Sequence, residues 1–234
     1  MNLSQILMVV IPTITAVGLL VAIVFLIFYK KDKPKKPKKK ELEKAHKEYV
    51  EEVKGEVLDS LKDIVRKNGG YIFSQYRIEL TKNNSKEIDH VLIYKGGLFV
   101  ISDKVDKGSV KGQVGDLTWE ITNENYELDV KPNPVIQNQR SVELIGRLLT
   151  KNKPQNIYGL VIYPYADLKG VKGTKNVFNT DEAVNFILDK MNENDLSTKE
   201  VEYIHQDLMA IKLKYGVTET HHSNNQKRKR INDE

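Results

Sequence analysis

A tight hairpin is the feature that most constrains the fold of this chain. Residues 91–94 and 98–101 are two short apolar runs, and Lys95-Gly96-Gly97 separates them. Apolar runs of this length with a glycine-rich turn between them predict two neighbouring antiparallel strands. The chain must therefore contain a sheet, and the polar groups that flank the two runs must lie at the ends of these strands.

The polar residues of this hairpin gather at one end. Asp89 opens the first strand, and Ser102, Asp103 and Lys104 close the second. Because side chains alternate across a strand, Ser102 and Lys104 share one face and Asp103 points to the other. We therefore expect Asp89 and Lys104 to lie close together. Asp103 reaches the same place only if a bulge at the strand end redirects its carboxylate.

The N-terminal segment predicts a membrane anchor. Residues 6–29 are 24 consecutive residues without a charge. As a helix they would be about 36 Å long, against a hydrocarbon core of about 30 Å. No positive residue precedes the segment and no small-x-small cleavage pattern follows it, so a retained span fits better than a cleaved signal peptide. We expect residues 1–29 to form a single transmembrane anchor.

Eight lysines follow the apolar segment directly, within residues 30–40. By the positive-inside rule, the N-terminus lies outside and residues 30–234 lie in the cytoplasm. Each lysine near anionic lipid headgroups contributes about 1 kcal/mol, although two prolines suit a solvated, extended spacer equally well. The expected membrane-surface residues are Lys30, Lys31, Lys33, Lys35, Lys36, Lys38, Lys39 and Lys40.

The net charge of +5 comes from the two ends of the chain. Residues 30–40 carry +7 and residues 226–234 carry +2, which leaves −4 for residues 41–225. The folded part therefore has no general field that attracts phosphate. Residues 217–234 are expected to be a disordered basic tail, which either contacts nucleic acid or serves only as a solvated end. The absence of cysteine excludes disulfides and thiolate–zinc sites, and suits a reducing cytosol.

Hydrophobic periodicity predicts the elements of residues 41–216. These elements alternate between strands and helices, which indicates an α/β fold with a mixed sheet flanked by helices, after the one transmembrane helix. The expected order is a helix to about Lys67, a strand at 71–80, a polar turn at 81–86, the hairpin, short strands within 110–130, a helix at 135–149, a central strand at 157–163, a short strand at 177–179, and helices capped by Thr180 and Ser197.

Four short motifs occur in order within roughly residues 47–150. They are Gly55-Glu56 on the first helix, Glu87-Ile-Asp-His90, Lys104 followed by Gly108-x-x-x-Gly112, and Asn133-Pro-x-x-Gln137. Together they resemble the nuclease-related domain family, NERD. The resemblance implies a restriction-endonuclease-like core of the PD-(D/E)xK superfamily, with a mixed sheet between helices and a magnesium-dependent phosphodiesterase site.

The resemblance also implies roles for single residues. Glu56 and Asp89 match the acidic metal-binding positions, and Lys104 and Gln137 match the catalytic lysine and glutamine. The implied cofactor is Mg²⁺, or Mn²⁺ in its place, and the implied partner is nucleic acid. Glu56 also stands at the edge of the apolar stripe of its helix, where a carboxylate needs a cation, a donor or water.

One position departs from the family pattern. The family reads Ile-Glu-x-Lys, and this chain reads Ile101-Ser102-Asp103-Lys104. A hydroxyl is a poorer Mg²⁺ ligand than a carboxylate. Asp103, with a bulge, or Asp106, if the strand continues, would have to replace the missing acid. The sequence therefore leaves two functions open. One is a membrane-anchored, metal-dependent nuclease for DNA or RNA. The other is a non-catalytic module that binds nucleic acid or holds a membrane complex.

Overall fold

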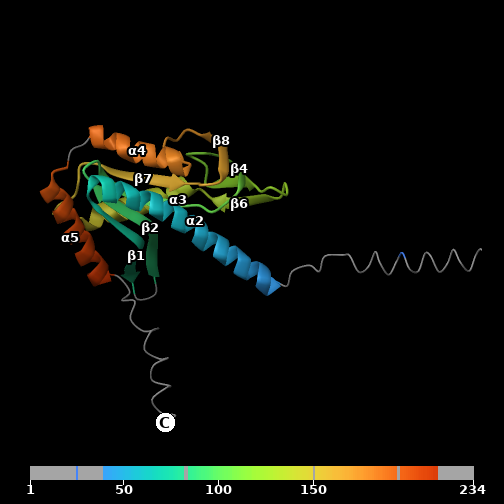
Figure 1. Cartoon of the computed structure of the whole chain (residues 1–234), viewed down its shortest axis with the longest axis horizontal. Coiled ribbons are helices and arrows are strands. Elements are labelled where there is room, and N and C mark those ends of the chain that lie inside the picture. Colours follow the sequence, from blue (N-terminus) through green and yellow to red (C-terminus); the bar gives the residue numbers. More distant parts are fainter. Residues whose placement is uncertain (1–24, 26–38, 82–83, 150, 194–195, 216–234) are drawn as a thin grey trace, which may run out of the picture. The chain divides into compact units, whose positions relative to one another are not determined.

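The computed structural model of the protein describes residues 25, 39–81, 84–149, 151–193 and 196–215 (Figure 1). Contacts divide the chain into two units, residues 1–47 and 48–234. The expected anchor (apart from Phe25), the lysines up to Lys38 and the tail from residue 217 lie outside the described residues. Within the described residues, no helix has both the length and the apolar character needed to cross a membrane.

A five-stranded mixed sheet forms the centre of the larger unit. Its strand order is β1 (Tyr71–Thr81), β2 (Asn84–Tyr94), β3 (Gly97–Asp103), β7 (Ile157–Ile162) and β9 (Val177–Phe178). The first three strands are antiparallel, and β7 and β9 run parallel to β3. The expected hairpin is confirmed, with Tyr94 opposite Gly97.

Helices cover both faces of this sheet (Figure 1). α2 (Lys39–Asn68) and α4 (Thr180–Glu193) pack on one face, and α3 (Pro134–Leu148) and α5 (Thr198–Tyr215) pack on the other. The strands β2 and β3 are apolar on both sides because each face meets its own core. Leu92 and Phe99 join the core under α2 and α4, while Val91 and Val100 join the core under α3 and α5.

A second, four-stranded mixed sheet lies beside the first. Its order is β6 (Leu128–Pro132), β5 (Thr118–Thr122), β4 (Gly108–Gln113) and β8 (Ala166–Lys172). The α/β class with a mixed sheet and flanking helices is confirmed, but the strands form two sheets where one was expected. The chain leaves the first sheet after β3 and again after β7, and the strands that follow, β4 and β8, pair with each other.

Two element ends differ from the expectation. The stretch 81–86 was predicted as a turn, but β1 reaches Thr81 and β2 begins at Asn84, because Glu79 pairs with Ser85 across the two strands. Asp89 therefore lies inside β2. At the start of α4 the capping residue is Asn179, whose side chain accepts from the backbone N–H of Glu182 at 2.9 Å.

Candidate functional site

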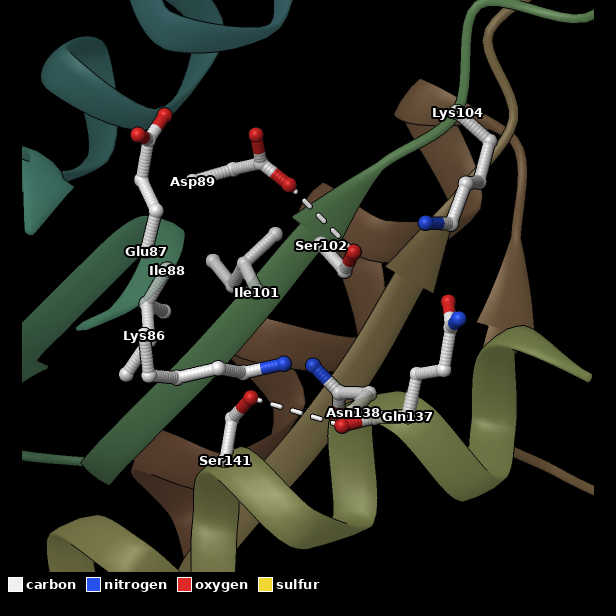
Figure 2. Close-up of a pocket in the computed structure, with 10 residues that line it drawn as sticks. All are labelled: Lys86, Glu87, Ile88, Asp89, Ile101, Ser102, Lys104, Gln137, Asn138 and Ser141. Atoms are coloured by element: carbon white, nitrogen blue, oxygen red, sulfur yellow. Dashed lines mark hydrogen bonds between the residues drawn. The ribbon is translucent and has the colours of Figure 1, made fainter. Parts of the chain in front are cut away.

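Asp89, Lys104 and Gln137 line a single polar pocket with a volume of about 150 Å³ (Figure 2). Strands β2 and β3 and helix α3 supply its walls. The structure thus brings together three of the five residues predicted as catalytic or metal-binding. The other lining residues are Lys86, Glu87, Ile88, Ile101, Ser102, Asn138 and Ser141.

The antiparallel register of β2 and β3 places Ser102 beside Asp89. His90 pairs with Ile101, so the next pair along the hairpin is Asp89 and Ser102. The Ser102 hydroxyl donates to Asp89 Oδ2 at 3.3 Å, and the backbone N–H of Asp103 donates to the same oxygen at 3.1 Å. The residue that replaces the family glutamate therefore acts as a hydrogen-bond donor to the remaining acid.

The other oxygen of Asp89 is held by a lysine from α2. Lys54 Nζ lies 2.6 Å from Asp89 Oδ1, and the two side chains are 36% and 20% exposed. Burial alone would lower the pKa of Lys54. The hydrogen bond and the charge of Asp89 outweigh that effect, so the pKa of Lys54 is raised. Lys54 is therefore a firmly protonated cation at the edge of the site.

The lysine of the predicted motif is partly buried. Burial lowers the pKa of Lys104, and the charges of Asp89 and Asp106 oppose this only in part. Among the described residues, no hydrogen bond or ion pair to its ammonium group is found. In Figure 2 its side chain extends toward Ser102, and Gln137 extends toward it from α3. The pocket thus contains a cation that lacks a direct acidic partner within the described chain.

Helix α3 is fixed close to the sheet by Asn138. This buried side chain donates to the backbone carbonyl of Val100 at 3.1 Å. Gly159 on β7 makes the approach feasible, because a Cβ at that position would lie 2.3 Å from Asn138 Oδ1. One turn after Gln137, the Ser141 hydroxyl donates to the Gln137 carbonyl at 3.4 Å. The polar face of α3 therefore forms a rigid wall of the pocket.

Glu56 does not line this pocket. It is exposed on α2, and its carboxylate accepts a hydrogen bond from the Tyr165 hydroxyl. That hydrogen bond raises the pKa of Tyr165 to about 12. Glu56 and Tyr165 line a separate surface hollow beside the start of α4. The structure therefore separates Glu56 from Asp89, although both match acidic positions of the family motif.

The two acids considered as replacements for the missing glutamate also bind elsewhere. The Asp103 side chain is fully buried, and its Oδ2 is hydrogen-bonded to His90 Nε2 at 2.7 Å. His90 Nδ1 lies 3.2 Å from the Ser74 hydroxyl. Asp106 accepts from the ammonium group of Lys131. Asp103 thus points to the opposite face from Ser102, as strand alternation predicts, and β3 shows no bulge that redirects it.

These contacts do not fit a site for Mg²⁺ or Mn²⁺. Such an ion needs several oxygen ligands, including one or two carboxylates that are free to bind it. Among the described residues that line the pocket, the acids are Glu87 and Asp89, and three donors already occupy the two oxygens of Asp89, which leaves the single carboxylate of Glu87. Within the described ranges, no group of three or more histidine, aspartate or glutamate side chains is arranged to hold a metal ion.

The comparison with protein families agrees with this arrangement of motifs. A model of the nuclease-related domain, NERD, matches residues 48–164, half of the 234 residues. The chain belongs to the NERD family. The matched region extends past the 47–150 expected from the motifs and so includes β7, the strand that pairs with β3. No curated protein and no solved structure matches the chain.

Four residues in or beside this NERD pocket were not predicted from the sequence, and two of them had a usable signal. Lys54 lies about 40° from Val50 around α2, so it stands at the edge of the apolar stripe just as Glu56 does. Ser141 follows Gln137 by one helical turn. The remaining two residues, Lys86 and Asn138, had no such signal, because only strand pairing and helix packing bring them to the site.

The asparagine of the NERD motif Asn133-Pro-x-x-Gln137 is structural. Asn133 is almost fully buried and caps α3, accepting from the backbone N–H groups of Val135 and Ile136 at 2.9 and 3.4 Å. Its amide group donates to three carbonyl oxygens of the turn that follows β4, those of Gln113, Val114 and Asp116. Asn133 thus joins the second sheet to the helix that carries Gln137.

The glycines of the motif Gly108-x-x-x-Gly112 are also structural. Gly108 has a positive φ of +96°, and a Cβ there would lie 2.1 Å from the Thr122 carbonyl oxygen. At Gly112 a Cβ would lie 2.3 Å from the ring of Trp119, which is buried in the core of the second sheet. These two glycines permit the close packing of β4 against β5, and neither lines the pocket.

Proposed function

We propose that this NERD protein binds the phosphate backbone of nucleic acid in the pocket between β2, β3 and α3. The observation that carries the proposal is the position of Lys104. This partly buried ammonium group faces the pocket together with Gln137 and has no acidic partner in direct contact within the described chain. Partial loss of water around an unpaired cation is unfavourable, and a bound anion offsets that cost.

The other pocket residues have the chemistry that a phosphate group requires. Lys86 supplies a second cation, and Ser141 and Gln137 supply neutral donors. Lysine is a common phosphate ligand because its ammonium group acts as a compact point charge. The volume of about 150 Å³, equal to about five water molecules at ~30 Å³ each, is room for one phosphate group.

Because the folded part is acidic, its binding to nucleic acid must depend on local contacts. Residues 41–225 carry a net charge of −4, so long-range attraction to nucleic acid is weak. Affinity then depends on the few lysines of the pocket. For two phosphate contacts on a single strand, log K is expected to fall with log[salt] with a slope of about −1.4. A much steeper slope would point to the basic ends of the chain instead.

Fluorescence anisotropy with a labelled single-stranded oligonucleotide tests the proposal on the full chain in detergent micelles. Lys104→Met and Lys86→Met should each weaken binding by about tenfold to a hundredfold, as expected for the loss of one hydrogen bond to a charged group, which is worth about 1.5–3 kcal/mol. Lys169→Met is the matched control, because Lys169 is 93% exposed on β8, outside the pocket. Equal affinities for Lys104→Met and the wild type would contradict the proposal.

A second candidate is metal-dependent hydrolysis of DNA or RNA. Its support is the convergence of Asp89, Lys104 and Gln137, which match the acid, lysine and glutamine of the NERD motifs, in one pocket. The wild type and Ser102→Glu should be incubated with single- and double-stranded substrates in Mg²⁺ or Mn²⁺. Cleavage by the wild type that Asp89→Asn abolishes would establish this function. Failure of both proteins to cleave would reject it.

We further propose that the domain is held at the inner face of the cell membrane. The uncharged residues 6–29 and the eight lysines of residues 30–40 support this location. Membrane fractionation of the full chain should recover the protein with the membranes after a carbonate wash. Protease added to sealed, inside-out vesicles should remove the NERD domain, and its protection there would contradict the cytoplasmic orientation.

A further inference from the structure

The contact between Lys54 and Asp89 suggests how this pocket differs from a metal-dependent one. Lys54 Nζ lies 2.6 Å from Asp89 Oδ1, while Ser102 and the backbone of Asp103 donate to Oδ2. Every recorded partner of the Asp89 carboxylate is thus a hydrogen-bond donor. In a site for a divalent ion, a carboxylate in this position would give at least one oxygen to the metal.

We propose that the ammonium group of Lys54 takes the place of a divalent cation beside Asp89, and that phosphate binding in this pocket does not depend on divalent metal. The inference rests on the proposed phosphate-binding function and specifies its cofactor requirement. The acids that were candidates to bind a metal together with Asp89, those at positions 56, 103 and 106, all bind other groups.

The formal charges of the pocket show why Lys54 matters. Together with Lys54, the charged residues are three lysines and two acids, which gives a charge of +1. Without Lys54 the charge is zero. With a glutamate at position 102 and no Lys54 it is −1, and a phosphate would then be repelled unless a metal ion entered. The pair of Lys54 and Ser102 therefore accounts for a pocket that can accept an anion directly.

The positions of the charged groups support the same conclusion. Figure 2 shows Lys86 and Lys104 reaching into the pocket from its two ends, while Asp89 lies beside Ser102. The charge of Glu87 also acts on Lys54, as do those of Asp89 and Asp103. Lys54 thus compensates the acids on the α2 side of the hairpin and leaves the other two lysines free for an anion.

Two measurements on the full chain in detergent micelles test the inference. The first is oligonucleotide affinity in EDTA and in Mg²⁺. The wild type should bind equally in both. Lys54→Met should lose roughly tenfold in EDTA, because the net charge of the pocket falls from +1 to zero, and should recover in part with Mg²⁺. Lys54→Arg should behave like the wild type. Lys62→Met is the matched control, because Lys62 is a similarly exposed α2 lysine that pairs with Asp59.

The second measurement uses Mn²⁺ alone, followed by electron paramagnetic resonance, and needs no nucleic acid. The double variant Lys54→Met/Ser102→Glu should bind Mn²⁺ at least about tenfold more tightly than Ser102→Glu, because the ammonium group no longer opposes the metal. Wild-type affinity for Mn²⁺ at this site comparable to that of the double variant would overturn the inference. So would wild-type oligonucleotide binding that requires Mg²⁺.

The two measurements separate failure of the inference from failure of the proposed function. If the wild type binds no oligonucleotide in either buffer, the phosphate-binding function is wrong, and the Mn²⁺ series still decides whether Lys54 excludes the metal. If Lys54 only fastens α2 to the sheet, Lys54→Met lowers thermal stability but changes neither the effect of EDTA nor the affinity for Mn²⁺. That result would also overturn the inference.

Discussion

Replacing Asn133 tests whether the motif residue at the start of α3 is structural or catalytic in this protein. The side chain is 1% exposed and makes five hydrogen bonds. Asn133→Ala removes the cap of α3 and three donors to the turn after β4. Because Asn133 does not line the pocket, we expect the main effect on the free energy of unfolding.

The structure allows the size of that effect to be worked out. Loss of the cap costs about 1 kcal/mol. The carbonyl of Gln113 keeps two other donors, the Trp119 ring N–H at 2.9 Å and the Asp116 N–H at 3.2 Å, so its loss is small. The carbonyls of Val114 and Asp116 lose Asn133, but both residues are exposed and water can replace it in part, at about 0.5–1 kcal/mol each. The total is about 2–3 kcal/mol.

Two further variants separate the cap from the amide donors. Asn133→Ser keeps a capping oxygen but loses the donors, so it should cost about 1–2 kcal/mol. Asn133→Asp keeps the cap and adds a favourable charge at the helix N-terminus, yet it places a carboxylate oxygen against three carbonyl oxygens. Asn133→Asp should therefore be less stable than Asn133→Ser.

Urea unfolding followed by tryptophan fluorescence is the suitable assay. Trp119 is the single tryptophan of the chain, and it contacts the same Gln113 carbonyl as Asn133. Asn125→Ala, in an exposed turn, is the control and should stay within about 0.5 kcal/mol of the wild type. A cost below about 0.5 kcal/mol for Asn133→Ala, or an Asn133→Asp as stable as the wild type, would refute the reasoning.

Three other predictions follow from the site. Asp103→Ala should lower stability by about 2–3 kcal/mol, because Nε2 of buried His90 loses its partner. It should not change oligonucleotide affinity, and a change in affinity would show that Asp103 acts in the pocket. Because burial lowers the pKa of Lys104, oligonucleotide affinity should fall as the pH rises through that lowered pKa. Between the lowered pKa and pH 10.5 the unfolded chain binds more protons than the folded chain, so stability should rise with pH over that range. Lys104→Arg should keep its oligonucleotide affinity to higher pH than the wild type. If the affinity of this variant falls at the same pH as that of the wild type, Lys104 is not the group that titrates. Gly112→Ala should cost about 1–3 kcal/mol in thermal unfolding by displacing Trp119, and a neutral result would show that the strand adjusts.

Much of the fold could be predicted from the sequence because it depends on local patterns. The turn predicted at Lys95-Gly96-Gly97, the periodic apolar positions of α2 and the capping box at Ser197 each predicted an element that the structure contains. The division into two sheets could not be predicted. Pairing of β4 with β8 joins residues about sixty positions apart, and no local pattern specifies which distant strands meet.

For the site, the sequence by itself determined that Asp89, Ser102 and Lys104 fall at one end of a hairpin and that Asp103 points away, because side-chain alternation is a local property of a strand. It also determined membership of the NERD family through the order of its motifs. Only the tertiary structure decided that Glu56 binds Tyr165 and that Lys54 binds Asp89. Both residues lie on one helix, and the packing of α2 against the sheet decides which of them reaches the pocket. That packing depends on contacts between residues far apart in the chain. The motif that contains Asp89 therefore could not show that a lysine of α2 lies beside it.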